Sequence, residues 1–156
     1  MIKVEIPGYG ALEIHHVVLD LNGTLATDGT VPDTVVERLG DLAGQVGLHV
    51  VTADTFGTAG RLRQVGLHVL ILEPGDQVAA KARLVRELGA SRTVAIGNGM
   101  NDEGMLREAV LGIAVIGREG AARQALLAAD LVVTSIEGAL DLLSIPKRLI
   151  ASLRRA

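Results

Sequence analysis

The sequence predicts a doubly wound α/β fold with a mainly parallel sheet in one domain. Short stretches rich in Val, Leu and Ile alternate with segments of helical periodicity, which is the pattern of repeated βαβ units. These apolar stretches are continuous, as expected for strands that are covered on both faces. The chain has 156 residues, of which 49% are hydrophobic, so one sizeable core can form. We therefore expect helices on both faces of one sheet.

The N-terminus predicts a β-hairpin. Residues 2–6 and 11–16 are two short alternating segments, and a turn beginning at Pro7 joins them. We expect this hairpin to lead into the first core strand and to extend an edge of the sheet. Since edge strands invite pairing, contact between copies of the chain through the hairpin is an alternative role. We divide the single domain into the hairpin (1–16), the core (17–143) and a C-terminal helix (144–156).

Each predicted core strand is a run of aliphatic residues bounded by turn formers. The first run, Val17 to Leu19, ends on Asp20 and is followed by a Gly-Thr turn. An Asp at the end of a strand can simply cap the next turn, so this residue alone does not mark a site. The strands are expected, in chain order, at residues 17–20, 48–51, 67–72, 93–96, 112–116 and 131–133.

The predicted helices lie between these strands. The first opens at Pro32 and places Val35, Leu39 and Leu42 on one side. Gly66 and Gly89 are the expected stops of the second and third helices. The helices are expected at residues 32–45, 58–65, 77–88, 102–109, 119–129, 136–143 and 147–153.

Composition excludes several classes of function. A net charge of −3 argues against a broad nucleic-acid footprint, and Tyr9 and Phe56 are too few aromatic rings for base stacking. Without cysteine there is no disulfide framework, thiolate nucleophile or zinc–sulfur site. No apolar run approaches the ~20 residues of a membrane span, and the first residues lack the apolar stretch of a signal peptide. We therefore expect a cytoplasmic protein that binds neither nucleic acid nor membrane.

The four histidines, at positions 15, 16, 49 and 68, lie in or beside predicted strands. The adjacent His15 and His16 would point to opposite faces of a strand and would be poor joint ligands. A core or surface role is favoured over catalysis for all four.

Polar residues gather where the predicted strands end. They share the carboxyl edge of a parallel sheet, where open α/β sheets bind ligands. Two carboxylates with amide and carbonyl oxygens suit Mg²⁺, while a lysine, a hydroxyl and glycine-loop amides suit a phosphate. Singly, each residue has an ordinary explanation, but together they favour a phosphoryl-transfer site with Asp20 as the nucleophile. The residues concerned are Asp20, Asn22, Thr52, Asp54, Lys81, Asn98, Asn101 and Asp102.

These segments resemble the four motifs of the haloacid dehalogenase-like (HAD) superfamily. The matching parts are residues 20–25 (Asp-Leu-Asn-Gly-Thr-Leu), Thr52, Lys81 and residues 97–102 (Gly-Asn-Gly-Met-Asn-Asp). Within that superfamily the chain resembles the small soluble proteins related to the phosphorylation domain of P-type ATPases, over roughly residues 16–143. The likeness implies a Rossmann-like HAD fold with Mg²⁺ as the cofactor and a phosphorylated substrate as the partner.

The resemblance also implies roles for single residues. Asp20 would accept the phosphoryl group and bind Mg²⁺, with Thr52 and Lys81 as the further catalytic residues. The implied phosphate contacts are Thr24, Thr52, Ala53, Lys81 and Asn101. The implied metal ligands are Asp20, Asn22 through its backbone carbonyl, and Asn98 and Asp102 directly or through water.

Two residues depart from the family pattern. HAD phosphatases usually carry an acid–base Asp at the position of Asn22, and losing such a group typically costs about 10²–10⁴ in rate. Asn98 stands where the family usually has a metal-binding Asp, which lowers the charge available to Mg²⁺. The two asparagines are either natural features of a subgroup of the family or engineered replacements of the aspartates of a parent enzyme. We therefore expect slow turnover or an accumulating phospho-aspartate.

The segment between Thr24 and Thr52 holds only one helix and turns, so we expect no large cap and no nucleotide domain. The leading hypothesis is a slow Mg²⁺-dependent phosphatase-like hydrolase acting through Asp20. The alternative is a catalytically weak or inactive HAD-like domain that binds a phosphorylated ligand or a protein partner. A subunit with a purely assembling role ranks last, because Thr52, Lys81 and Asp102 all remain. An oligomer of identical chains is compatible with each.

Overall fold

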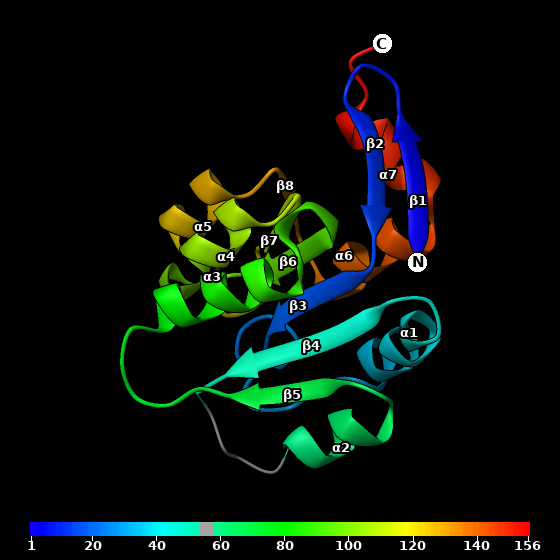
Figure 1. Cartoon of the computed structure of the whole chain (residues 1–156). Coiled ribbons are helices and arrows are strands. Elements are labelled where there is room, and N and C mark those ends of the chain that lie inside the picture. The colour runs from blue at the N-terminus through cyan, green and yellow to red at the C-terminus, as the bar shows by residue number, and fades with distance from the viewer. Residues whose placement is uncertain (54–57) are drawn as a thin grey trace.

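The computed structural model describes residues 1–53 and 58–156, and its centre is a six-stranded sheet (Figure 1). The strands lie in the order β5-β4-β3-β6-β7-β8, and every neighbouring pair is parallel. The predicted doubly wound parallel fold is therefore confirmed. The strands are β3 (His16–Asp20), β4 (Gly47–Thr52), β5 (His68–Ile71), β6 (Thr93–Gly97), β7 (Leu111–Val115) and β8 (Leu131–Val133).

Helices cover both faces of this sheet (Figure 1). Along β3, Val17 and Leu19 join the larger core cluster with residues of α1 and α6, whereas Val18 packs with Val85 of α3 and Met105 of α4. Successive side chains of a strand point to opposite faces, so each face acquires its own core. The helices are α1 (Asp33–Ala43), α2 (Thr58–Gln64), α3 (Gln77–Leu88), α4 (Glu103–Glu108), α5 (Arg123–Ala128), α6 (Ile136–Ser144) and α7 (Pro146–Leu153). No helix of the described segments is long and apolar enough to cross a bilayer.

The N-terminal hairpin forms as predicted, from β1 (Ile2–Ile6) and β2 (Gly10–Ile14), but its predicted place in the main sheet is wrong. β1 and β2 form a separate two-stranded sheet. β3 lies in the middle of the main sheet between β4 and β6, and β2 ends at Ile14, just before β3, so this short connection keeps the hairpin away from both edges. The hairpin instead lies beside α7 (Figure 1), and the backbone N–H of Arg155 donates to the Pro7 carbonyl at 2.9 Å.

Two predicted helices are shorter than expected. The helix predicted at 102–109 begins with a 3-10 turn, Met100–Asp102, and becomes α-helical only at Glu103. The helix predicted at 119–129 begins at Arg123, because Gly120 has a φ of +75° and pairs with Gly117 in a turn. Both differences lie at helix starts, where periodicity says least about the first residue.

The strand order places a switch point between β3 and β6. From β3 the chain builds outward through β4 and β5, and it then returns to the other side of β3 to form β6, β7 and β8. The loops after β3 and β6 therefore diverge at their carboxyl ends, which is where open α/β sheets hold ligands. The segment between β3 and β4 contains one helix, α1.

Candidate active site

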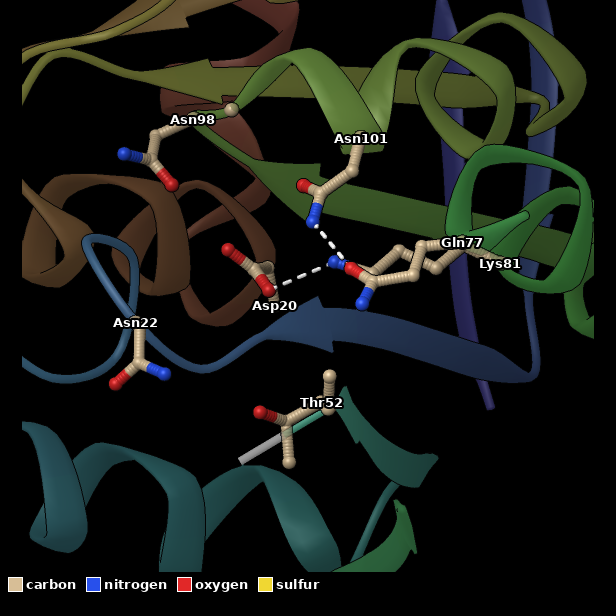
Figure 2. Close-up of a pocket in the computed structure, with 9 residues that line it drawn as sticks. Asp20, Asn22, Thr52, Gln77, Lys81, Asn98 and Asn101 are labelled. Atoms are coloured by element: carbon tan, nitrogen blue, oxygen red, sulfur yellow. Dashed lines mark hydrogen bonds and ion pairs between the residues drawn. The ribbon is translucent and has the colours of Figure 1, made fainter. Parts of the chain in front are cut away.

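A cavity of about 530 Å³ opens at the carboxyl ends of β3, β4 and β6 (Figure 2). Its walls come from the ends of these strands, from the first turns of α3 and from the loop after β6. It gathers most of the predicted site residues and adds one that was not predicted. The lining residues are Asp20, Asn22, Thr52, Ala53, Gln77, Lys81, Asn98, Gly99 and Asn101.

Lys81 is the central cation of the site. Its Nζ donates to Asp20 Oδ1 at 2.9 Å and to Asp102 Oδ1 at 2.8 Å, and the lysine is only 1% exposed. Burial by itself would lower the pKa of Lys81, but the two carboxylates outweigh it and raise this pKa. The lysine therefore stays charged and joins two segments that are far apart in the sequence.

Asp20 ends β3 on the face that α3 covers, and its side chain points into the cavity (Figure 2). Burial and then repulsion from Asp102 raise the pKa of Asp20 to about 6, although Lys81 acts in the opposite direction. The carboxylate is thus desolvated but reachable from the cavity, as a nucleophile must be.

Asp102 lies beneath the cavity and does not line it. Its Oδ2 accepts hydrogen bonds from the backbone N–H groups of Asn98 and Gly99 at 3.0 and 2.9 Å, and its Oδ1 accepts from Lys81. A Cβ on Gly97 would meet the Asp102 Cγ at 2.5 Å, so only glycine leaves room for this carboxylate. With both oxygens engaged and no exposure, Asp102 holds Lys81 and the loop in place. Its predicted metal role, directly or through water, stays a prediction.

Asn98 links three loops. Its Nδ2 donates to the Gly120 carbonyl at 3.1 Å, and its Oδ1 lies 3.1 Å from the Thr24 hydroxyl. A Cβ on Gly23, which has a φ of +79°, would come within 2.4 Å of the Asn98 Nδ2. Thr24 Oγ1 also lies 3.5 Å from Asp20 Oδ2, so this hydroxyl can support the nucleophile or Asn98. Asn98 lines the cavity, but its amide also fixes the loop after β3.

Thr24 was predicted to contact phosphate, and the structure places it differently. It is buried beside Asp20 and lines a second cavity, of about 560 Å³, on the other side of the Gly23–Thr24 turn. Asn22, Thr52 and Ala53 do line the first cavity, at the ends of β3 and β4. Asp54, which the sequence also suggested, lies outside the described residues.

Gln77 is the site residue that sequence reasoning missed. It opens α3 one turn before Lys81, lines the cavity, and accepts a 2.8 Å hydrogen bond at Oε1 from Asn101 Nδ2. Its spacing from Lys81, four residues along a helix, was the available signal, because such residues lie on one helix face. The bond between the amides (Figure 2) holds Asn101, predicted as a phosphate contact, at the cavity wall.

The donor set fits Mg²⁺ shared with a phosphate. Mg²⁺ prefers oxygen ligands, keeps several waters, and commonly uses one or two carboxylates together with substrate phosphate. Asp20 is the carboxylate among the described lining residues, and the side chains of Asn22 and Asn98 bring amide oxygens. Across residues 1–53 and 58–156, no three His, Cys, Asp or Glu side chains converge as a metal shell. Such a site fits Mg²⁺ only weakly until phosphate adds its oxygens.

The charges of the site explain why a cation is needed. Asp20 and Asp102 contribute two negative charges and Lys81 one positive charge, so the cluster carries a net charge of −1. A phosphate dianion entering the cavity would add negative charge at close range in a desolvated site. The arrangement can therefore present a carboxylate to a phosphate when a divalent cation compensates the charge.

Comparisons with known proteins find relatives of parts of the sequence and of the fold. No family model matches the chain. An uncharacterized protein of Methanocaldococcus jannaschii, MJ0073, is 45% identical over 84 residues, which is 51% of this chain and 90% of that protein. A probable phospholipid-transporting ATPase IIB of Danio rerio is 44% identical over 61 residues, which is 39% of this chain but only 5% of the ATPase.

Among solved structures, the 3-deoxy-D-manno-octulosonate 8-phosphate phosphatase of Moraxella catarrhalis is similar, with a TM-score of 0.64. That structure was determined with a magnesium ion, a phosphate ion and the sugar acid. The match covers 90% of this chain and 94% of the phosphatase at 20% identity, which establishes a shared fold.

Proposed function

The chain belongs to the haloacid dehalogenase-like superfamily, and on that premise we propose that it is a Mg²⁺-dependent phosphatase-like hydrolase. The single observation that carries the proposal is Lys81, which is buried between the Asp20 and Asp102 carboxylates beside an open cavity. Buried charges are expensive, and this group of three serves phosphoryl transfer better than it serves stability.

In the first step, an oxygen of the Asp20 carboxylate attacks phosphorus. The bond from phosphorus to the ester oxygen breaks, and its electron pair leaves with that oxygen, which takes a proton from solvent. Lys81 stays protonated and balances charge next to Asp20, while Thr52, Ala53 and Asn101 line the wall that holds the phosphate oxygens. Mg²⁺ held by Asp20, Asn98 and Asn22 would supply charge neutralisation and orientation when bound.

In the second step, water attacks the phosphorus of the phospho-aspartate. The bond between phosphorus and the Asp20 oxygen breaks, the Asp20 carboxylate is restored, the proton of the water passes to solvent, and inorganic phosphate leaves. Asn22 lines the cavity two residues after the nucleophile, but an amide cannot take the proton of that water. Positioned acid–base groups contribute about 10²–10⁴ in rate, so we propose that hydrolysis of the phospho-aspartate is the slow step.

The hydrogen bonds of the Asn98 side chain favour a second candidate function. In it the chain is a domain that binds a phosphorylated ligand without hydrolysing it. The Asn98 amide is used to connect the loop after β3 with the Gly120 carbonyl, so it is a weaker metal ligand than an aspartate. In this version the cavity, Lys81 and the loop amides bind phosphate, and Asp20 is never phosphorylated.

Steady-state hydrolysis of an aryl phosphate with Mg²⁺ separates the two candidates. We expect slow turnover by the unchanged chain and none by Asp20→Asn, because the amide is not a nucleophile. Asn22→Asp restores a general base and should raise the rate about 10²-fold or more. The matched control is Asp41→Asn, an exposed acid on α1 outside the cavity, which should keep the original rate.

Phosphate binding without hydrolysis in both the unchanged chain and Asn22→Asp would establish the binding domain instead. Equal hydrolysis by the unchanged chain and Asp20→Asn would refute the role of Asp20. Asn98→Asp is a poor test of the same idea, since a carboxylate cannot donate to the Gly120 carbonyl and the loop would lose that bond.

A further inference from the structure

Three histidines lie side by side on one face of the sheet, at the end opposite to the cavity. His16 begins β3, His49 lies within β4 and His68 begins β5, and His49 pairs in register with His68. Ring centroids are 5.2 Å apart for His16 and His49, and 5.0 Å apart for the stacked His49 and His68. His16 is four residue steps from Asp20, about 13 Å along β3, and none of the three histidines lines the catalytic cavity.

His16 and His49, on the neighbouring strands β3 and β4, bring two ring nitrogens close together. His16 Nδ1 lies 3.1 Å from His49 Nε2. Two imidazole nitrogens at about 2.0–2.1 Å from one metal ion would be about 2.9 Å apart at a right angle and about 3.4 Å apart at a tetrahedral angle. The observed separation falls between these values. A modest rotation of the rings would thus direct both lone pairs at one ion.

Gly47 makes this approach possible. It pairs with His16 across the two strands, and a Cβ at this position would meet His16 Nδ1 at 2.8 Å and His49 Nε2 at 3.1 Å. The two nitrogens therefore occupy space that any other residue at position 47 would fill. No positive φ is recorded for Gly47, so the close approach of the rings, and not the backbone, explains the glycine.

The surroundings keep both rings neutral. Burial, then the neighbouring histidines, lower the pKa of His49 to about 4, and burial followed by His15 and Arg92 lowers the pKa of His16. Arg92, His15 and His68 are the charged or titratable groups acting on the pair, and none of them is an acid. Neutral imidazole is the form that binds metals.

We propose that His16 and His49 form a binding site for one imidazole-preferring divalent cation, of the class of Zn²⁺, Ni²⁺ and Cu²⁺. Water completes the shell, because the described residues contain no three-ligand cluster. When the cation binds, the histidine that donates the shared hydrogen bond moves that proton to its other ring nitrogen. Both rings therefore stay neutral and no proton is released. Oxygen-preferring Mg²⁺ is not a ligand of this site. The proposal does not depend on the proposed phosphatase function.

The test is a titration of the untagged chain with Zn²⁺ in excess Mg²⁺, followed by the histidine ring resonances in NMR spectra. We expect saturable shifts of the His16 and His49 rings. His16→Gln and His49→Gln should each weaken Zn²⁺ binding by more than the about 10- to 100-fold that changes outside the ligand shell cost. Gly47→Ala removes no ligand but displaces a ring, and it should weaken binding about tenfold or more.

His15→Gln is the matched control, because His15 Nε2 hydrogen-bonds Glu13 and the His15 ring lies 6.5 Å from the His16 ring, farther than His49 does. It should leave the affinity unchanged, and Cu²⁺ should bind more tightly than Zn²⁺. Unchanged His16 and His49 resonances at saturating Zn²⁺ would overturn the proposal. So would equal affinities of the unchanged chain and the variant lacking both histidines.

Discussion

The two ends of strand β3 keep titratable groups out of water in opposite ways. At the carboxyl end, Lys81 forms buried ion pairs with Asp20 at 2.9 Å and with Asp102 at 2.8 Å. At the amino end, His16 and His49 are kept uncharged and share one hydrogen bond. One end thus balances buried charges against each other, whereas the other avoids them by losing protons.

The difference shows what each end can do. A paired cluster has fixed charge ready for a phosphate and a cation, but each member is needed to compensate the others. A neutral pair offers lone pairs and costs little as long as the pH stays above its lowered pKa values. Changes at the carboxyl end should therefore be severe at neutral pH, where Asp20 is ionised, while those at the amino end should appear only on acidification.

The largest effect is expected for Lys81→Met. This change leaves two carboxylates buried without their common partner, so the free energy of unfolding should fall by about 3–5 kcal/mol and hydrolysis should stop. Urea denaturation measures the first effect. Arg107→Met removes the exposed pair of Arg107 with Glu103 and should cost at most about 0.5 kcal/mol. Equal losses in both variants would remove the distinction between buried and exposed pairing.

A smaller loss of stability is expected when the glycine that contacts each group of side chains is replaced by alanine. Gly97→Ala pushes against Asp102, which three hydrogen bonds hold, and should cost about 2–3 kcal/mol. Gly47→Ala meets the tips of two rings that can turn and should cost about 1 kcal/mol. The control is Gly40→Ala on α1, where a Cβ meets nothing within 4 Å and should stabilise by roughly 0.5–1 kcal/mol. Thermal unfolding would contradict the comparison if Gly47→Ala cost as much as Gly97→Ala.

The smallest effect concerns acidity. The pKa of His49 is about 4 in the folded chain and near 6.5 when unfolded, so the unfolded chain takes up a proton that the folded chain refuses. Stability should therefore fall as the pH drops from 6.5 to 4, by ~1–2 kcal/mol after allowing for partial exposure. Asp20, with its raised pKa, acts in the opposite direction between about pH 6 and 4, so the unchanged chain alone is not informative.

The difference between the unchanged chain and His49→Gln, measured in metal-free buffer by urea denaturation at several pH values, isolates this contribution, because Asp20 is present in both. His49→Gln should lose less stability on acidification. Parallel pH profiles of the two proteins would show that the amino end is not kept neutral by folding.

The sequence predicted the strand-end residues well because strand ends in a parallel sheet must meet. Asp20, Thr52 and Asn98 accordingly come together at one cavity, which Lys81 reaches from α3. Two contacts were not predictable, because each depends on how a loop folds back. They are the hydrogen bond from Lys81 to Asp102 and the hydrogen bond from Asn98 to the Gly120 carbonyl.

The amino end was harder to predict for a related reason. His16 and His49 are far apart in the sequence, and only the register of β3 and β4 brings Gly47 beneath both rings. The hairpin shows the same limit. Its strands could be recognised by alternation, but their exclusion from the main sheet follows from the central position of β3, which no local pattern contains.

The most direct test of the central claim is the mass of the protein after mixing with an aryl phosphate and Mg²⁺ and quenching in acid. The account predicts that one phosphoryl group remains on the chain, on the peptide that contains Asp20, and that Asn22→Asp retains less of it. Asp20→Asn should retain none. A phosphoryl group on another residue, or hydrolysis by the unchanged chain with no phosphorylated form at any time, would contradict a phospho-aspartate at Asp20.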